Sequence, residues 1–203
     1  MSDFWNQRFS QKGYVYGEYP NEYLKEKLAL MNPGNILFPA EGEGRNAVYA
    51  TLLGWKAEAF DQSTQGKNKA EQLAVKNNIS IHYTIANAEN VSFPKESFDA
   101  IALIYSHFPE EFRRIWHRRL TTFLKKKGTL ILECFSKNQI DYQKDNLFAG
   151  GPRDVSMLYD LEDLKEDFTG FEFREAYETE VTLNEGASHQ GKSAVVRIFA
   201  TKS

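Results

Sequence analysis

Two glycines and an aspartate stand where they could bind a nucleotide. Residues 36–40 read as a short buried strand, Gly42 and Gly44 follow it, and Asp61 ends a second strand that begins at Lys56. Glycines let the backbone approach a ligand closely, and the start of the intervening helix offers N–H groups without partners. An acid about 20 residues beyond the glycines can accept both ribose hydroxyls of an adenosine. This stretch therefore predicts half of a nucleotide-binding sheet.

The elements that would position these residues alternate along the chain. We expect helices at 21–31, 45–53, 63–78, 110–124 and 160–168, and strands at 36–40, 56–61, 79–86, 98–106, 128–136, 171–183 and 192–201. Alternating strands and helices predict a parallel sheet with crossovers, and the last two strands predict an antiparallel hairpin. The expected fold class is α/β: a Rossmann-like, seven-stranded, mostly parallel sheet with an antiparallel C-terminal hairpin and helices on both faces.

Three segments are harder to assign from their pattern. Residues 4–19 are rich in aromatic side chains and contain Gly13 and Gly17, which predicts an irregular flap that is either statically packed or closes as a lid. Residues 137–159 lack clear periodicity, which is typical of a functional or disordered loop. Residues 184–191 exceed the needs of a tight turn. Gly128 is expected to terminate the helix 110–124, after basic residues that suit its negative end.

Composition excludes several classes of protein. The 203 residues suffice for a single domain with its own core, and 41% hydrophobic with 26% charged residues is ordinary for a globular protein. A net charge of −3 argues against a surface that coats nucleic acid. The single cysteine, Cys134, excludes an internal disulfide and is expected to be a small core residue. No apolar run approaches about 18 residues, and no apolar signal region begins the chain, so we expect a cytoplasmic protein without a membrane span.

Several stretches together carry a family resemblance. AEGEGRNAVYATLLGW, AFDQS, FDAIALIYSHFP and LKKKGTLILECFS resemble class I S-adenosylmethionine-dependent methyltransferases. The opening FWNQRF…YVYGEYPNEYL and the tail GGP…MLYDLEDLKEDF…NEGASHQGKSAVVR resemble the tellurite-resistance and thiopurine methyltransferase-like group within that class. The resemblance spans essentially the whole chain. It implies S-adenosyl-L-methionine as methyl donor and a small acceptor, for which thiols and chalcogen compounds are the candidates.

The resemblance also divides the chain and implies a donor site. Residues 1–34 would form the aromatic lid and a helix, 35–136 the donor-binding core, and 137–203 the acceptor-side loop, helix and hairpin. Asn87 would bond the adenine amino group, with the backbone of Ala88 or Glu89 at the ring edge. The full set expected to bind the donor is Trp5, Tyr14, Tyr16, Gly17, Glu41, Gly42, Gly44, Arg45, Asn46, Asp61, Gln62, Ser63, Asn87, Ala88, Glu89, Tyr105 and Ser106.

One position departs from the class pattern. The class usually has an acid at the end of the first strand, which helps to organise the amino-acid end of the donor, and this chain has Phe38 there. Glu41, directly before Gly42, is the nearest acid that could replace it. The departure makes a protein that binds S-adenosylmethionine or S-adenosylhomocysteine without catalysis an alternative. The glycine pattern with Asp61 leaves a nicotinamide-dependent oxidoreductase as a further alternative.

Three residues are candidates for proton transfer. His107 follows the fourth strand at its carboxyl end, where open α/β sheets bind ligands. Glu185 and His189 lie between the last two strands, and strand six should run parallel to the first five, which brings these residues to the donor edge. His82 and His117 are expected to be structural. No metal ligand set is expected. The anticipated partner is a small-molecule acceptor rather than nucleic acid or membrane, and the protein is expected to be a monomer or weak homodimer.

Overall fold

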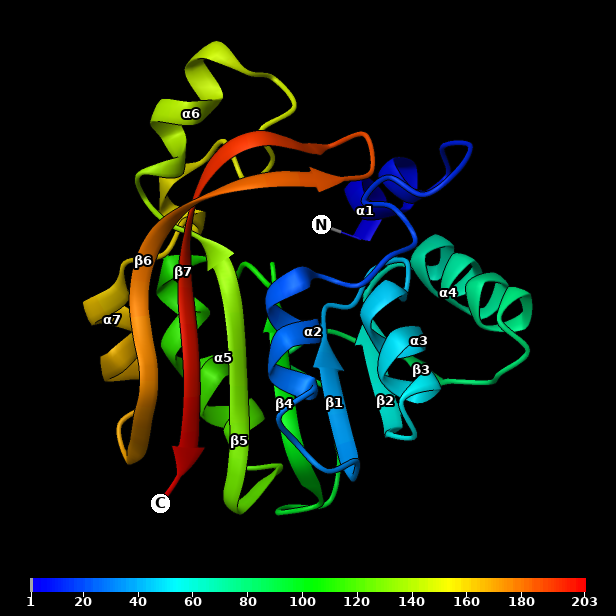
Figure 1. The fold of residues 1–203 in the computed structure, drawn as a ribbon, viewed down its shortest axis with the longest axis vertical. Helices are drawn as coiled ribbons and strands as arrows, with labels where there is room; N and C mark the ends of the chain where they lie inside the picture. The colour runs from blue at the N-terminus through cyan, green and yellow to red at the C-terminus, as the bar shows by residue number, and fades with distance from the viewer. Residues whose placement is uncertain (1) are drawn as a thin grey trace.

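The computed structural model describes residues 2–203 and contains one mixed sheet (Figure 1). Its seven strands have the order β3-β2-β1-β4-β5-β7-β6. They are β1 (Asn35–Pro39), β2 (Lys56–Asp61), β3 (His82–Ile85), β4 (Phe98–Ile104), β5 (Leu124–Phe135), β6 (Phe171–Glu185) and β7 (His189–Lys202). The pairs β1–β2, β1–β4, β2–β3 and β4–β5 are parallel, whereas β7 is antiparallel to both β5 and β6. The predicted fold class and the direction of strand six are therefore confirmed.

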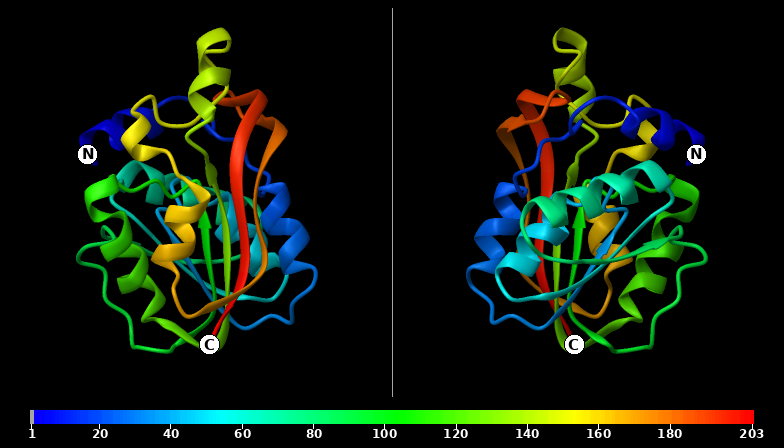
Figure 2. Two further views of the ribbon diagram at one scale, coloured as in Figure 1. Left: turned by 90° about the vertical axis from the view of Figure 1, so that its left-hand side faces the viewer. Right: turned by 90° about the vertical axis from the view of Figure 1, so that its right-hand side faces the viewer.

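Helices cover both faces of this sheet, as Figure 2 shows. They are α1 (Ser2–Phe9), α2 (Glu22–Leu28), α3 (Arg45–Leu52), α4 (Thr64–Lys76), α5 (Glu110–Thr121), α6 (Gln139–Asp145) and α7 (Leu161–Asp167), with a short 3₁₀ turn, η1, at Val155–Met157. Helices α5 and α7 lie on one face, and α2 and α3 on the other. None of these helices of residues 2–203 is long and apolar enough to cross a membrane.

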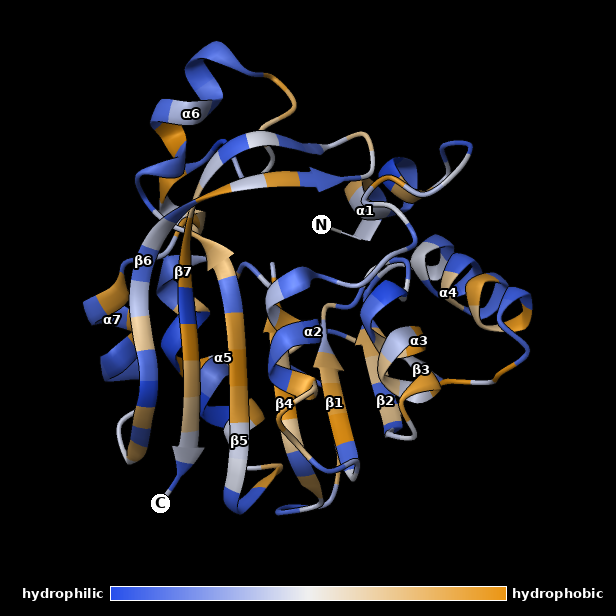
Figure 3. Ribbon diagram, in the orientation of Figure 1, coloured by the Kyte–Doolittle hydropathy of each residue, from blue (hydrophilic) through white to orange (hydrophobic). Residues whose placement is uncertain are grey.

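Strand side chains alternate between two apolar layers. In β1, Ile36 and Phe38 join the layer under α2 and α3, while Leu37 points into the layer under α5 and α7. All three are fully buried. This alternation follows from the period of two along a strand, and the central strands are correspondingly hydrophobic (Figure 3). Because helices cover both faces of the sheet, its carboxyl edge is where polar side chains can meet a ligand.

The structure corrects the boundary between α5 and β5. Helix α5 ends at Thr121, and β5 begins at Leu124 rather than at Gly128. Leu124 pairs with Phe98, after which the register shifts, and Lys127 adopts a positive φ of 61°. The three lysines therefore belong to an irregular start of β5 and not to the end of the helix. Gly128 is needed because a Cβ there would lie 2.7 Å from the Leu124 side chain.

Three other segments are more regular than their patterns predict. The aromatic N-terminus begins with the helix α1, and the segment 137–159 contains α6 and η1. The loop that follows helix α6 is bonded to it, because the side chain of Gln143 in the helix donates to the carbonyls of Gly150 and Gly151. The hairpin tip is also shorter than expected, since Glu185 still pairs with His189. The turn is therefore only residues 186–188, and the length of 184–191 is strand rather than loop.

Candidate active site at the carboxyl edge of the sheet

The glycine turn and Asp61 form one hydrogen-bonded unit. Asp61 ends β2, where its Oδ2 accepts the Gly42 N–H at 3.1 Å and its Oδ1 accepts the Ser63 N–H at 2.8 Å. Gly42 and Gly44 have φ values of 63° and 88°, in the region that favours glycine. A Cβ at Gly44 would lie 2.4 Å from that of Ala70, so this glycine also allows α3 to approach α4.

The environment of Asp61 suits a carboxylate that accepts hydroxyl groups. The residue is 7% exposed, and burial raises its pKa to about 6 against the opposing effect of the backbone N–H groups of Ser63 and Gly42. A carboxylate has about four acceptor positions, of which these two bonds use only two. Asp61 can therefore accept both hydroxyls of a ribose, with Gln62 and Ser63 directly beside it.

The position that lacks an acid is part of the core, and Glu41 lies at the start of α3. Phe38 is fully buried. Oε1 of Glu41 accepts the N–H groups of Asn46 and Ala47 at 2.8 Å each, so this carboxylate lies at the start of α3. Burial raises the pKa of Glu41 to about 7. Glu41 therefore stands at the turn itself, at the N-terminal end of α3, where a negative charge is favoured.

The predicted adenine segment lies beside Asp61. The Ala86 N–H donates to the carbonyl of Asp61, and the next three residues continue from there. Oδ1 of Asn87 accepts the N–H groups of Glu89 and Asn90 at 3.0 Å, which closes a local turn. Ala88 is buried, with its carbonyl accepting from Arg119. The segment is thus at the expected edge, and its contact with adenine stays a prediction.

Glu43 holds the N-terminal segment over this edge, a role that the sequence analysis missed. Its Oε2 accepts the Val15 N–H at 2.8 Å and the Tyr16 N–H at 3.4 Å, and Oε1 lies 2.8 Å from Nζ of Lys69. Lys69 also donates to the carbonyls of Gln11 and Gly13. The glycine turn and α4 therefore bind the segment by charge-assisted bonds. An acid between two glycines is the only signal that the sequence offered.

Aromatic residues of the N-terminal segment pack on the site from above. Phe9 is buried, with its ring 3.0 Å from the position of a Cβ on Gly42, and it stacks with Trp5 at 5.3 Å between ring centroids. Tyr14 donates its hydroxyl to the Lys69 carbonyl, and Tyr16 accepts from Arg8 at 2.8 Å. We call residues 4–19 the lid. Its closure over a ligand stays a prediction.

The hairpin tip reaches the same edge and meets the lid (Figure 1). The Ala187 N–H donates to the Val15 carbonyl, and a Cβ at Gly17 would lie 3.1 Å from the Gly186 nitrogen. Oε2 of Glu185 lies 2.8 Å from Nη2 of Arg45, in the first turn of α3. The hairpin tip therefore reaches the edge that carries the glycine turn, as the direction of β6 predicted, and it also contacts the lid there.

Glu185 and His189 form a buried acid–imidazole pair. Nδ1 of His189 lies 3.1 Å from Oε2 of Glu185, and the ring packs between Tyr16 and Tyr105 at 4.5 and 4.6 Å between centroids. Burial lowers the pKa of His189, whereas Arg45 is the main group that lowers the pKa of Glu185, to about 2 despite burial. The imidazole is therefore neutral at pH 7 and donates through Nδ1, which makes Nε2 its basic atom.

The structure gives His107 a different environment. Its Nδ1 lies 2.7 Å from the Met157 carbonyl, and its Nε2 accepts the Phe135 N–H at 3.2 Å. Burial lowers its pKa to about 4. Both ring nitrogens thus bind backbone, which favours a positioning role over proton transfer. Next to it, Ser106 donates to the carbonyl of Pro39 and so ties β4 to the end of β1. Cys134 is fully buried, as expected, and burial raises its pKa.

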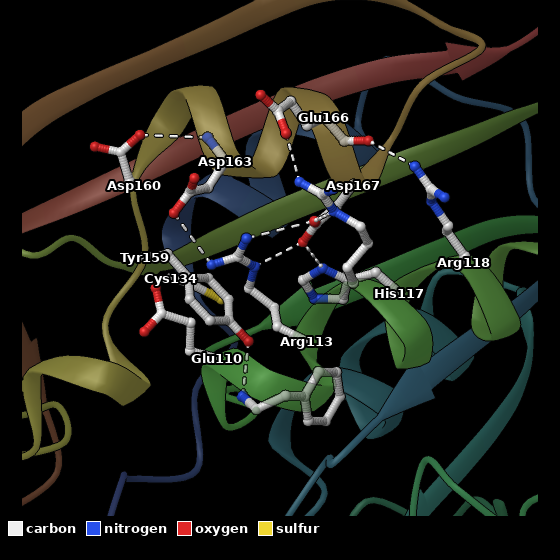
Figure 4. A network of polar contacts seen from close by, with 12 residues as sticks. Glu110, Arg113, His117, Arg118, Cys134, Tyr159, Asp160, Asp163, Glu166 and Asp167 are labelled. Carbon is white, nitrogen blue, oxygen red and sulfur yellow. Dashed lines mark hydrogen bonds and ion pairs between the residues drawn. The ribbon is translucent and has the colours of Figure 1, made fainter.

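The remaining histidines lie away from this edge. His82 begins β3 at the opposite edge of the sheet and is exposed. His117 is fully buried between α5 and α7, where its Nδ1 lies 2.9 Å from Oδ2 of Asp167 (Figure 4). Arg113 and Arg114 bind the same carboxylate, so much of the basic face of α5 is neutralised by α7. Within residues 2–203, no cluster of three or more His, Cys, Asp or Glu side chains could hold a metal ion.

Comparison with known proteins bears on the fold and on residues 36–128. Residues 36–128 match the family described as "Methyltransferase domain". A protein whose structure concerns conversion of a disulfide bond into a thioacetal group during echinomycin biosynthesis superposes with a TM-score of 0.80 and 15% identity, over 100% of this chain and 92% of the other. TehB from Haemophilus influenzae superposes with a TM-score of 0.72 and 16% sequence identity, over 100% of this chain and 67% of TehB. Magnesium protoporphyrin IX methyltransferase from Synechocystis PCC 6803, with bound SAH, superposes with a TM-score of 0.71 and 15% sequence identity. The superposition covers 100% of this chain and 97% of the other.

At these identities the superpositions show the fold, which is that of class I methyltransferases. No curated protein matches the sequence significantly. The fold and the carboxyl edge that carries Gly42 and Asp61 agree with the nucleotide-binding half-sheet that the sequence predicts. The match to the methyltransferase-domain family runs from β1 through α5, and together with the fold it supports the predicted methyl transfer from S-adenosylmethionine.

Proposed function

We propose that this enzyme transfers a methyl group to the sulfur or another chalcogen atom of a small molecule bound beneath the lid and the hairpin tip. The observation that carries the proposal is the Glu185–His189 pair, which the hairpin delivers to Arg45 beside the glycine turn. A neutral imidazole whose Nδ1–H is held by a carboxylate is arranged to take a proton at Nε2. Thiols and selenols carry such a proton and become strong nucleophiles when they lose it.

Each residue of the site would have a separate role in the reaction. When bound, S-adenosylmethionine supplies a methyl group on a sulfonium, which is already a good leaving group. Asp61 would hold the ribose through its remaining acceptor positions. His189 would accept the thiol proton at Nε2, and Glu185 would stabilise the resulting imidazolium. The lid and hairpin tip exclude water and align the reactants, which can supply several kcal/mol of the barrier.

The resemblance to the tellurite-resistance and thiopurine methyltransferase-like group supports a sulfur or chalcogen acceptor. Two of the superposed structures agree with it in part: one concerns a thioacetal formed from a disulfide, and another is TehB. Phe38 favours a second candidate, a protein that binds S-adenosylmethionine without turnover, because the usual acid is replaced by a core phenylalanine. The family match favours methyl transfer over the nicotinamide-dependent alternative.

Formation of S-adenosylhomocysteine, measured against a panel of small thiols, selenols and chalcogen oxyanions, tests the proposal. We expect turnover with at least one thiol or selenol. His189→Ala should lower kcat about a hundredfold, within the range for loss of a general base, and leave S-adenosylmethionine affinity nearly unchanged. His82→Ala, at the opposite edge, is the matched control and should retain full activity. Binding without turnover across the panel would favour the non-catalytic candidate, and full activity of His189→Ala would remove this residue from the mechanism.

A further inference from the structure

Asn21 makes an unusual number of contacts for a residue outside the site proper. It is 1% exposed and precedes α2, where its Oδ1 accepts the Leu24 N–H at 2.9 Å as the helix cap. Its side-chain Nδ2 donates to Oε1 of Glu133 at 2.6 Å and to Oε1 of Glu185 at 3.3 Å. One amide therefore bridges the buried carboxylate of Glu133 in β5 and the part-buried carboxylate of Glu185 in β6.

The backbone of Asn21 extends this connection to the donor side. Its N–H donates to Oδ1 of Asn46 at 3.0 Å. The Asn46 N–H in turn donates to Glu41, in the glycine turn. A single residue thus links the start of α3, where we expect the donor to bind, to the acid that holds His189.

The chemistry of the bridge explains why an amide stands there. Glu133 is paired with Arg197 at 2.6 Å, and Glu185 with Arg45 at 2.8 Å, so each carboxylate has one cation. A buried carboxylate that lacks a further donor costs free energy, and a third anion between these two would be repelled. A neutral donor binds both Oε1 atoms and leaves Oε2 of Glu185 for Arg45 and His189; Oε1 of Glu133 also accepts the Tyr105 hydroxyl at 2.8 Å, so the donor from Asn21 matters most to Glu185.

We propose that Asn21 is a positioning residue, which fixes the orientation of Glu185 and thereby that of His189 for proton transfer. This inference rests on the proposed function, since it requires His189 to act as the base. Asn21 itself touches neither reactant. Its contribution is the geometry of the acid–imidazole pair and the neutrality of the space between Glu133 and Glu185.

The pH dependence of activity separates this role from mere support of the fold. The titratable or charged groups around the pair come from every element packed against it: Arg8 and Tyr16 of the lid, Glu41 and Arg45 at the start of α3, Tyr105 and His107 after β4, Glu133 of β5, Glu185 of β6 and Arg197 of β7. In the wild type, kcat should rise with pH as His189 loses its proton and then level.

Two variants keep an acceptor for the cap of α2 and change only the bridge. Asn21→Ser removes the donor to both carboxylates, so kcat should fall about ten- to a hundredfold at every pH, the equivalent of one bond to a charged group. Asn21→Asp introduces a carboxyl whose pKa is raised by its two neighbours. While protonated its single O–H can still donate to Glu185, and once ionised it repels that carboxylate, so kcat should fall again at high pH and give a bell-shaped profile.

Asn184→Asp makes the same charge change at the neighbouring, exposed position of β6 and should retain the wild-type profile. S-adenosylmethionine affinity should be unchanged in all three variants, because the N–H bond to Asn46 is preserved. Asn21→Ser and Asn21→Asp with wild-type kcat and pH profiles would overturn the inference, provided that His189→Ala is impaired. Full activity of His189→Ala would instead refute the proposed function on which the inference rests.

Discussion

The amide of Gly42 donates to Oδ2 of Asp61 over 3.1 Å, so the turn after β1 and the end of β2 cannot move independently. The same carboxylate accepts from Ser63, the N-cap of α4. A ligand that binds Asp61 therefore meets an acceptor whose orientation is already fixed. This preorganisation reduces the entropy that binding must overcome.

Asp61→Ala should weaken S-adenosylmethionine binding by roughly 2–4 kcal/mol, because two charge-assisted hydrogen bonds to ribose are lost. Isothermal titration calorimetry gives the affinity, and the melting temperature shows whether the fold survives the loss of the bonds to Gly42 and Ser63. Asp99→Ala, which removes a partly exposed acid at the opposite edge of the sheet, is the control. Unchanged affinity in a folded Asp61→Ala protein would remove the residue from the donor site.

Donor affinity should also depend on pH through Asp61. Burial raises the pKa of this carboxyl to about 6, and only the ionised form accepts both hydroxyls. Affinity should therefore be complete above about pH 7 and decline as the pH falls through about 6. Glu41, whose pKa burial raises to about 7, titrates nearby, so Asp61→Asn is needed to isolate the effect. If Asp61→Asn shows the same pH dependence as the wild type, another group is responsible.

Gly150 sets the space available to the His189 ring. A Cβ at this position would lie 2.5 Å from Cδ2 of His189 and 2.9 Å from Cζ of Phe135. Gly150→Ala should therefore displace the imidazole and lower kcat, besides the cost of an alanine at a φ of 83°, about 1–2 kcal/mol. Gly170→Ala has similar backbone strain, at a φ of 88°, but no atom within 4 Å, so it should lose stability and keep kcat. Equal kcat in the two variants would contradict the steric argument.

The parts of the site that could be predicted from the sequence are those that follow directly from the ends of predicted strands. Gly42, Gly44 and Asp61 follow strands whose ends must share one edge of a parallel sheet, and the direction of β6 placed Glu185 and His189 there. These predictions required only strand order and the handedness of crossovers. The same logic placed His107 at the edge, yet could not show that both of its ring nitrogens bind backbone.

The residues that were missed depend on contacts between distant segments. Glu43 was indistinguishable from a solvated acid until the lid supplied the amides of Val15 and Tyr16. The prediction that Gly128 ends the helix 110–124 was wrong because Leu124 already pairs with Phe98 in the sheet. This pairing overrides the helical propensity of the residues before Gly128. Tertiary contacts decide such positions, and a single sequence does not display them.

The lid offers the last prediction, because Glu43 joins it to the donor site. Glu43 is 4% exposed and accepts two lid amides, those of Val15 and Tyr16, as well as Lys69. A ligand on the glycine turn should stabilise the closed lid, so amide hydrogen exchange of residues 4–19 should slow when S-adenosylhomocysteine is bound. Glu43→Gln leaves a weaker, neutral acceptor and should speed exchange at Val15 and Tyr16 about tenfold or more without ligand.

Glu71→Gln, at an exposed position of α4 that pairs with Lys67 over 3.7 Å, is the matched control and should exchange like the wild type. Glu43→Gln should also weaken S-adenosylhomocysteine binding, since the lid then closes less completely over the bound molecule. The effect should be absent from a chain that lacks residues 2–19, because that chain has no lid to hold. Equal protection of residues 4–19 with and without S-adenosylhomocysteine would instead identify the segment as a permanent cover of the site.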